Sequence, residues 1–327
     1  MLLYILRRAA SAISVIFVTL VASYALFLLA PTDPAGTICG PKCTPDRAAE
    51  ITKALELEEP PLLQIGAYLK GVVAGRDYEI GGTVRECDAP CLGYSFALGR
   101  PVTELIGDAL PVTLSIVGGA AIIYFGTGVL VGTLAARHRG TTLDRLAVSS
   151  SLTINSVPYF IVVLLVALYL SGVVIPRSEY HPLLENPLAW AAGLMAAWLT
   201  LGLTNAASYT RYSRAAMIES LGQDYVRTAR SKGISERRVV YRHGVRAGLS
   251  PVVTIVGLDI AYQLTNTLFT ESIFGLPGLG LLTLRAFNTY DLPVLLGSVL
   301  VGSTVLVLMN LLVDIIYSFL DPRVRIA

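Results

Sequence analysis

Six long runs of apolar residues constrain the fold of this chain more than any other feature. Crossing a hydrocarbon core about 30 Å thick takes about 20 apolar residues in a helix, and each run is long enough. The charged fraction is 15%, below the average of about 25% for soluble chains. We therefore predict an all-α polytopic membrane protein with six transmembrane helices. The runs cover residues 9–30, 109–136, 147–175, 188–208, 248–270 and 293–320.

Basic residues indicate the orientation of the chain. They are dense in residues 209–247, between the fourth and fifth runs, and cytoplasmic loops carry an excess of Lys and Arg. We therefore expect a protein of the cytoplasmic (inner) membrane, in contact with lipid, with both termini in the cytoplasm. No base-stacking module accompanies the basic residues, so no nucleic-acid partner is predicted. Those of the loop are Arg211, Arg214, Arg227, Arg230, Lys232, Arg237, Arg238, Arg242 and Arg246.

This topology divides the chain into three parts. Residues 1–30 hold the N-terminus and the first transmembrane helix, residues 31–108 form an extracytoplasmic cap, and residues 109–327 form the transmembrane core. The first apolar run is longer than that of a typical signal peptide, and no Ala-x-Ala-like cleavage site follows it. We interpret it as a retained span.

The cap is predicted to be a small helical insertion. Thr44-Pro45-Asp46 is typical of a helix N-terminus, with a capping residue, a proline and a first-turn acid. Pro60-Pro61 ends this helix, and residues 62–75 have the pattern of a second, amphipathic one.

All four cysteines fall in the cap. Cys39 and Cys43, and then Cys87 and Cys91, share a C-x3-C spacing. Outside the cytoplasm such cysteines usually form disulfides, so we predict two bridges. A four-thiolate zinc site and free thiols are the competing interpretations, and the sequence does not choose the pairing.

The basic loop has the pattern of two short helices joined by a turn. Leu221, Tyr225 and Ala229 recur at helical spacing, Gly233 suits the position after a helix end, and Ser235 suits the cap of the next helix. An interfacial helix with snorkelling arginines would show the same pattern. The alternative is a docking element for a soluble partner.

The loop and four further stretches resemble one family. Arg227-Thr228-Ala229 stands where the EAA loop of bacterial ABC importers has Glu-Ala-Ala, and Gly233 matches the glycine of that motif. The usual Ile-x-Leu-Pro element is absent at its distance, with the proline delayed to Pro251. The chain resembles a permease subunit of the dipeptide/oligopeptide/nickel family. The other stretches are MLLYILRRAASAISVIFVTLVASYALFLLAPTDPA, RPVTELIGDALPVTLSI, ESIFGLPGLGLLTLRAFNTYDLPVLLG and NLLVDIIYSFLDPRVR.

This resemblance implies a function and partners. It implies import of di- or oligopeptides by a complex with a second homologous permease subunit, two cytoplasmic ATPases and an extracytoplasmic substrate-binding protein. Residues 209–247 would be the ATPase-docking loop of the permease core, with Arg227, Thr228, Ala229 and Gly233 in ATPase coupling. ATP and Mg would be bound by the ATPases, and this chain would hold no cofactor. Nickel complexes and glutathione remain alternative cargoes.

Polar residues inside the predicted spans mark a candidate substrate pathway. Asp259, Gln263 and Asn266 share one helical face, and Thr270 extends it. Such a stripe lines a wet pathway or a polar interface with a partner helix. Asn155, Ser156 and Pro158 predict an irregularity in the third span.

Enzyme chemistry has no support in the sequence. There is no G-x4-G-K-[ST] motif, no H-E-x-x-H pair and no G-x-S-x-G elbow. We expect no catalytic residues and no metal ligands, which argues against an intramembrane hydrolase. An ion-coupled secondary transporter is a further alternative, although it would favour an internal repeat and several buried ionisable groups.

Overall fold

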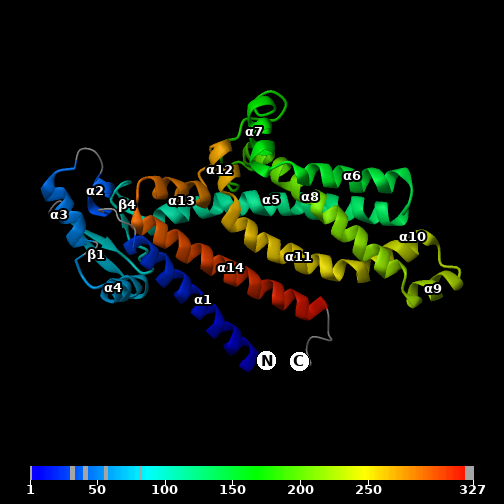
Figure 1. The fold of residues 1–327 in the computed structure, drawn as a ribbon, viewed down its shortest axis with the longest axis horizontal. Helices are drawn as coiled ribbons and strands as arrows, with labels where there is room; N and C mark the ends of the chain where they lie inside the picture. Colours follow the sequence, from blue (N-terminus) through cyan, green and yellow to red (C-terminus); the bar gives the residue numbers. More distant parts are fainter. Residues whose placement is uncertain (1, 30–33, 40–42, 55–57, 81–82, 321–327) are drawn as a thin grey trace. The chain divides into compact units, whose positions relative to one another are not determined.

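The computed structural model describes residues 2–29, 34–39, 43–54, 58–80 and 83–320. Most of these residues are helical (Figure 1). The chain forms two compact units. The first comprises Met1–Thr113 and Pro277–Val307, and the second comprises Leu114–Leu276 and Leu308–Ala327.

The first unit begins with helices. Thr44 caps α3 as predicted, because its Oγ1 accepts a hydrogen bond from the Arg47 N–H at 3.4 Å. Pro61 occupies the first turn of α4, where the missing N–H costs nothing. The helices of this part are α1 (Leu2–Leu29), α2 (Pro34–Cys39), α3 (Pro45–Ala54) and α4 (Pro61–Ala74).

The cap is not purely helical, so that prediction was wrong. Strands β1 (Arg76–Ile80) and β2 (Thr83–Cys87) pair antiparallel, with Arg76 opposite Cys87 and Ile80 opposite Thr83. A second short pair joins β3 (Tyr94–Ser95) to β4 (Arg100–Pro101). The β-branched and aromatic residues of β1 and β2 flank Gly81-Gly82 in the sequence, and this pattern is a hairpin signal.

The core of the first unit joins the cap to the helices that follow it. Leu92, Val102, Ile106 and Val294 are buried together. They bring the start of α5 (Val102–Arg137) against the start of α14 (Leu292–Leu320). Helix α13 (Leu279–Asn288) adds Leu279 and Ala286 to this cluster.

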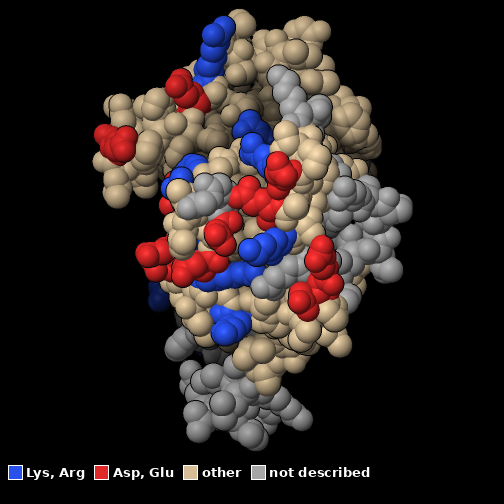
Figure 2. Space-filling view, turned by 90° about the vertical axis from the view of Figure 1, so that its left-hand side faces the viewer, with Lys and Arg blue, Asp and Glu red and all other residues tan. Residues whose placement is uncertain are grey.

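Charged side chains cover the outer part of this unit. Figure 2 shows acidic and basic side chains interleaved on the side where α3 and β1 lie. Lys53 lies 3.8 Å from Glu79. The surface is therefore of mixed charge rather than a field of one sign.

The second unit packs around α8 (Pro187–Leu221). Trp198 of this helix donates a hydrogen bond from Nε1 to the Ser115 carbonyl at 2.9 Å. Gly119 is required at this crossing, because a Cβ there would lie 2.2 Å from the Trp198 ring. The remaining elements are α6 (Thr142–Ser156), α7 (Tyr159–Tyr169), α9 (Asp224–Ser231), α10 (Glu236–Arg238), a π-helix (Val239–Gly244), α11 (Val245–Asn266) and α12 (Leu268–Phe274).

Three helices of the described residues are long and apolar enough to cross a membrane, namely Val102–Arg137, Pro187–Leu221 and Leu292–Leu312. Two bent pairs raise the number to five if each counts as one span. Helices α6 and α7 are bent by 90°, and α11 and α12 by 52°. The first bend confirms the irregularity predicted at Asn155, Ser156 and Pro158. The second was not predicted, since neither Pro nor Gly stands near Thr267.

Candidate functional site

The first candidate site is the basic loop, which the structure builds from short helices. Helix α9 ends in a Schellman motif: the Gly233 N–H donates to the Arg230 carbonyl at 2.9 Å, and the Ile234 N–H donates to the Ala229 carbonyl at 3.3 Å. Gly233 has φ +74°, which L side chains rarely adopt. This confirms Gly233 as the residue that ends the helix. Ser235 stands at the cap of α10 as predicted, but its side chain makes no capping hydrogen bond.

The loop has a small core of its own. Val226, Ala229 and Val239 are buried together, with Leu221 and Ile234 packed against them. Of the predicted coupling residues, Ala229 therefore faces inward. Arg227, Thr228 and Gly233 are exposed.

An ion pair ties the two halves of the loop. Arg230 Nη2 lies 2.8 Å from Glu236 Oε1, and Arg230 Nε donates to Glu236 Oε2 at 3.1 Å. The Arg230 guanidinium lowers the pKa of the Glu236 carboxyl through these hydrogen bonds. Both side chains are more than two-fifths exposed, so the pair contributes little stability.

The π-helix that follows is anchored to α8. Ser220 Oγ donates to the Gly244 carbonyl at 2.9 Å. Met217 packs with Val240 and Ala136 in a buried cluster. The loop is thus continuous in packing with α8.

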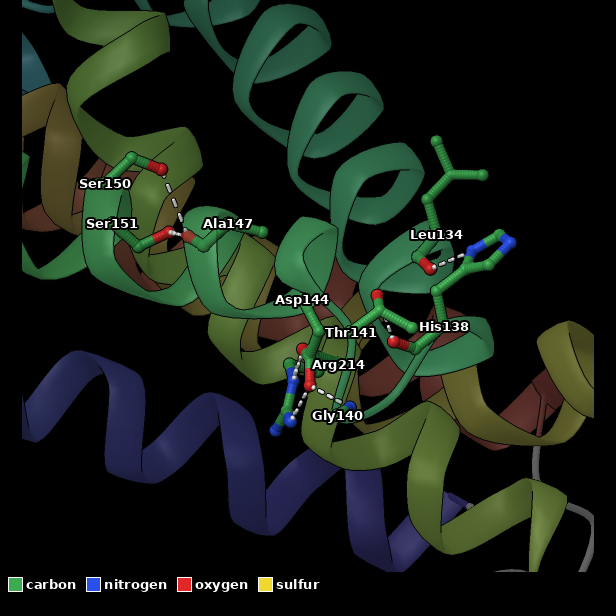
Figure 3. Close-up of polar contacts among 9 residues, drawn as sticks. All are labelled: Leu134, His138, Gly140, Thr141, Asp144, Ala147, Ser150, Ser151 and Arg214. Atoms are coloured by element: carbon green, nitrogen blue, oxygen red, sulfur yellow. Dashed lines mark hydrogen bonds and ion pairs between the residues drawn. The ribbon is translucent and has the colours of Figure 1, made fainter.

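Arg214 was expected in the loop, but it lies in α8 and pairs with Asp144 of α6 (Figure 3). Its Nε and Nη2 donate to the two carboxylate oxygens at 2.5 and 2.8 Å. Asp144 Oδ2 also accepts from the Gly140 N–H at 2.9 Å. Arg214 therefore holds the turn before α6 rather than facing a partner, and the sequence analysis missed this pair.

The predicted pathway stripe does not stay together. Asp259 Oδ2 accepts a hydrogen bond from the Tyr209 hydroxyl at 2.5 Å, and Tyr209 stacks on Tyr124 with ring centroids 4.8 Å apart. Thr270 lies beyond the bend at Thr267, in α12, so it does not extend the α11 face. Asn266 ends α11, and its side chain lies outside what the structure describes.

Gln263 is the stripe residue that reaches a pocket. The pocket has a volume of about 570 Å³ and lies where both bent helix pairs break. Its lining includes Asn155, Ser156, Tyr159, Asn205 and Gln263. Asn155 and Ser156 signalled the bend in sequence, but nothing there indicated that they face Gln263.

The cysteines lie in two local pairs. Cys39 and Cys43 have a Cα–Cα distance of 5.0 Å, and Cys87 and Cys91 one of 5.4 Å, each pair being joined through its sulfurs. The second pair is buried beside Tyr78 and Tyr94.

Comparisons place this arrangement in a class of membrane transport components, and within it in one family. The chain belongs to the family described as the binding-protein-dependent transport system inner membrane component, whose sequence model matches residues 128–326. The model of the family's N-terminal region matches residues 1–117.

Relatives match the whole chain. A putative peptide transport system permease protein of Brucella abortus is 35% identical over 98% of both chains. A probable peptide ABC transporter permease protein of Sinorhizobium fredii is 32% identical over 98% of this chain and 99% of its own. The dipeptide transport system permease protein DppB of Escherichia coli is 32% identical over 99% of both chains.

A solved structure shares the fold. A chain of the inward-facing MetNI methionine ABC transporter superposes with a TM-score of 0.54 and 18% identity, covering 67% of this chain and 97% of its own. The likeness supports the mostly helical architecture of an ABC transporter membrane subunit.

Proposed function

We propose that this chain is the permease subunit of an ATP-driven ABC importer that moves peptides across the cytoplasmic membrane. The observation that carries the proposal is identity of 32–35% along the whole length of relatives named as peptide permeases. Matches over the cap and the core alike mean that the likeness is not confined to one motif.

The proposed complex contains further chains. This subunit pairs with a second, similar permease, and two cytoplasmic ATPases bind ATP and Mg. An extracytoplasmic protein delivers the peptide. ATP binding then biases the permease pair between inward- and outward-facing states, and this chain performs no covalent step.

The topology we propose has six spans with both termini in the cytoplasm. Helix α1, of 28 residues, supplies the first span. The two bent pairs supply the third and fifth. Residues 31–108 then lie outside, where the paired cysteines meet an oxidising environment.

We assign the ATPase contact to the exposed side of α9. Arg227 and Thr228 are exposed there, and the Arg227 side chain is 74% exposed. Ala229 and Gly233 act differently in this proposal. Ala229 packs the helix onto its own core, and Gly233 allows the turn that ends it.

Co-purification tests the assembly. Affinity-tagged chain extracted in mild detergent from its native membrane is expected to bring down an ABC ATPase and a second permease in fixed ratio. A chain that purifies alone and catalyses solute uptake by itself in liposomes would instead be a secondary transporter.

A further inference from the structure

The pocket at the two helix breaks has defined walls. Segments 154–159, 201–205 and 262–269 contribute its lining. Beyond the breaks, α7 and α12 are held together by the Tyr159 hydroxyl, which lies 2.6 Å from Thr270 Oγ1. The rings of Phe160 and Phe269 also lie 6.3 Å apart. At about 570 Å³, the pocket falls within the range of about 300–1,000 Å³ typical of small-molecule sites.

The lining combines amides with apolar and aromatic groups. None of the residues that line it, all described by the structure, is Asp, Glu, Lys, Arg or His. The polar members are Asn155, Ser156, Thr204, Asn205, Gln263 and two tyrosines, Tyr159 and Tyr262. The others are Ile154, Val157, Pro158, Leu201 and Phe269.

The hydroxyl groups of Ser156 and Thr204 are already used. Each donates to the carbonyl four residues earlier in its own helix, at 2.8 and 2.6 Å. Asn205 Nδ2 likewise donates one N–H to the Leu201 carbonyl at 2.8 Å, which leaves its second N–H as a donor and its carbonyl oxygen as an acceptor. The two hydroxyl groups therefore offer the pocket only acceptors, whereas Asn205 offers one donor and one acceptor.

Gln263 supplies further donors. Its side chain is half-buried and makes no hydrogen bond with any residue that the structure describes. A glutamine amide carries two donors and one acceptor oxygen, which matches the N–H and C=O of a peptide group. Asn155 adds a further amide, whose Nδ2 donates to Ser208 Oγ at 3.2 Å.

We propose that this pocket binds the uncharged main-chain amides of the transported peptide, with Gln263 and Asn205 as its hydrogen-bonding groups. The inference rests on the proposed function, since it takes the cargo to be a peptide. Charged termini and charged side chains have no counter-ion in the lining, and burying an unpaired charge is costly. Because main-chain amides are common to all peptides, the pocket is tolerant of side chains.

Asp259 is not part of this site. It does not line the pocket, and its carboxylate accepts a hydrogen bond from the Tyr209 hydroxyl. The pocket therefore does not select cationic peptides through Asp259, which sequence reasoning had placed on the same stripe.

The test uses the complete reconstituted transporter with its binding protein and ATPases. Initial uptake of radiolabelled tri-alanine is compared with that of the same peptide N-methylated at its central amide. Gln263→Leu and Asn205→Ala are each expected to lower tri-alanine uptake at subsaturating concentration about two- to tenfold, the worth of one hydrogen bond. Gln263→Leu is also expected to lower the ratio of tri-alanine uptake to uptake of the N-methylated peptide.

Controls separate folding from recognition. Leu258→Met, on α11 but outside the pocket lining, is expected to keep wild-type uptake. Gln263→Glu preserves side-chain shape, so it remains informative if Gln263→Leu fails to assemble. This variant is expected to shift preference toward a tripeptide with a central lysine by about fivefold or more.

The experiment distinguishes failure of the proposed cargo from failure of the pocket assignment. A wild-type complex that hydrolyses ATP but imports no peptide would show that the proposed cargo is wrong. Peptide import with unchanged uptake, methyl discrimination and charge preference in the three pocket variants would show that the pocket assignment is wrong and leave the proposed function standing.

Discussion

At the scale of single residues, the pair between Asp144 and Arg214 organises the turn before α6. Asp144 is 4% exposed and bonds both the guanidinium and the Gly140 N–H. Two planar groups meet with two parallel hydrogen bonds, which makes the contact directional as well as attractive. The pair explains why one arginine assigned to the basic loop contacts this chain instead of a partner.

Asp144→Ala is expected to lower the unfolding free energy by about 2 kcal/mol, because it leaves a partly buried guanidinium without its acceptor. The loss is kept below that of a fully buried pair by the 26% exposure of the Arg214 side chain. Asp144→Asn should lose less, since it can still accept from Gly140. Thermal unfolding of the purified wild type, Asp144→Ala and Asp144→Asn measures these differences in stability. Additive losses in the Asp144→Ala, Arg214→Ala double variant would contradict a direct interaction.

Asp291 is a buried carboxylate outside the membrane-spanning helices. It precedes α14, hydrogen-bonds the Ser95 hydroxyl, and is 1% exposed. Burial raises the pKa of Asp291, against the opposite effects of the Ser95 hydroxyl and the Val294 N–H. The folded state therefore favours the protonated carboxyl.

The raised pKa predicts a stability change with a definite sign. The favourable contribution of Asp291 is present below the ordinary carboxyl pKa and is lost as pH rises through the raised one. Asp291→Asn, which keeps an acceptor for the Ser95 hydroxyl without the charge, should thus gain stability relative to wild type as pH rises. Asp291→Ala should lose about 1 kcal/mol at neutral pH, because it removes the hydrogen bond with Ser95. A difference in unfolding free energy between wild type and Asp291→Asn that stays constant between pH 4 and pH 8 would refute this account.

At the scale of elements, the basic loop combines an exposed side of α9, which we propose contacts an ATPase, with a supporting core. Arg227→Glu is expected to reduce peptide-stimulated ATP hydrolysis about fivefold or more, a typical coupling effect, while Arg227→Lys retains it. Ala229→Asp should also uncouple the complex, but by placing a charge in the core of the loop. Limited proteolysis separates the two causes, since only Ala229→Asp should expose the loop to cleavage. Peptide-stimulated ATP hydrolysis at the wild-type rate in Arg227→Glu would show that α9 does not form the ATPase contact.

The pairing of the four cysteines in the cap can be tested directly. Mass mapping of the mature protein under non-reducing conditions is expected to find Cys39 linked to Cys43 and Cys87 linked to Cys91, without free thiols. Replacing Cys87 and Cys91 by Ser should destabilise the cap by about 2 kcal/mol through lost loop closure, with the transmembrane helices intact. Stoichiometric zinc, with four thiols alkylated after chelation, would favour the metal site.

The sequence predicted three boundaries that a local chemical signal marks, although it also held the unused hairpin signal at Gly81-Gly82. Gly233 marked the end of α9, Thr44 the start of α3, and Pro158 the bend between α6 and α7. The bend at Thr267 lacks such a residue and depends on packing, so α11 and α12 were taken as one helix. The hydrogen bond of Asp259 with Tyr209 and the pocket beside Gln263 could not be predicted either, because they involve residues distant in the chain.

At the scale of the whole molecule, the resemblance to a known family predicted more of the function than residue patterns did. Apolar runs and charge predicted a polytopic membrane protein and an orientation that stays a prediction, and the family motifs predicted the transport class. The pocket required the structure, because its lining comes from three segments that the sequence does not relate. Cargo class is therefore the claim to which family likeness and pocket chemistry both contribute.

Uptake by the reconstituted complex tests that claim most directly. Proteoliposomes containing both permeases and the ATPases, with binding protein outside and ATP inside, are expected to accumulate labelled di- or tripeptide. Accumulation should stop when ATP is replaced by a non-hydrolysable analogue or when the binding protein is omitted. Accumulation of nickel complexes or glutathione without peptide, or peptide uptake by this chain alone without ATP, would contradict the account.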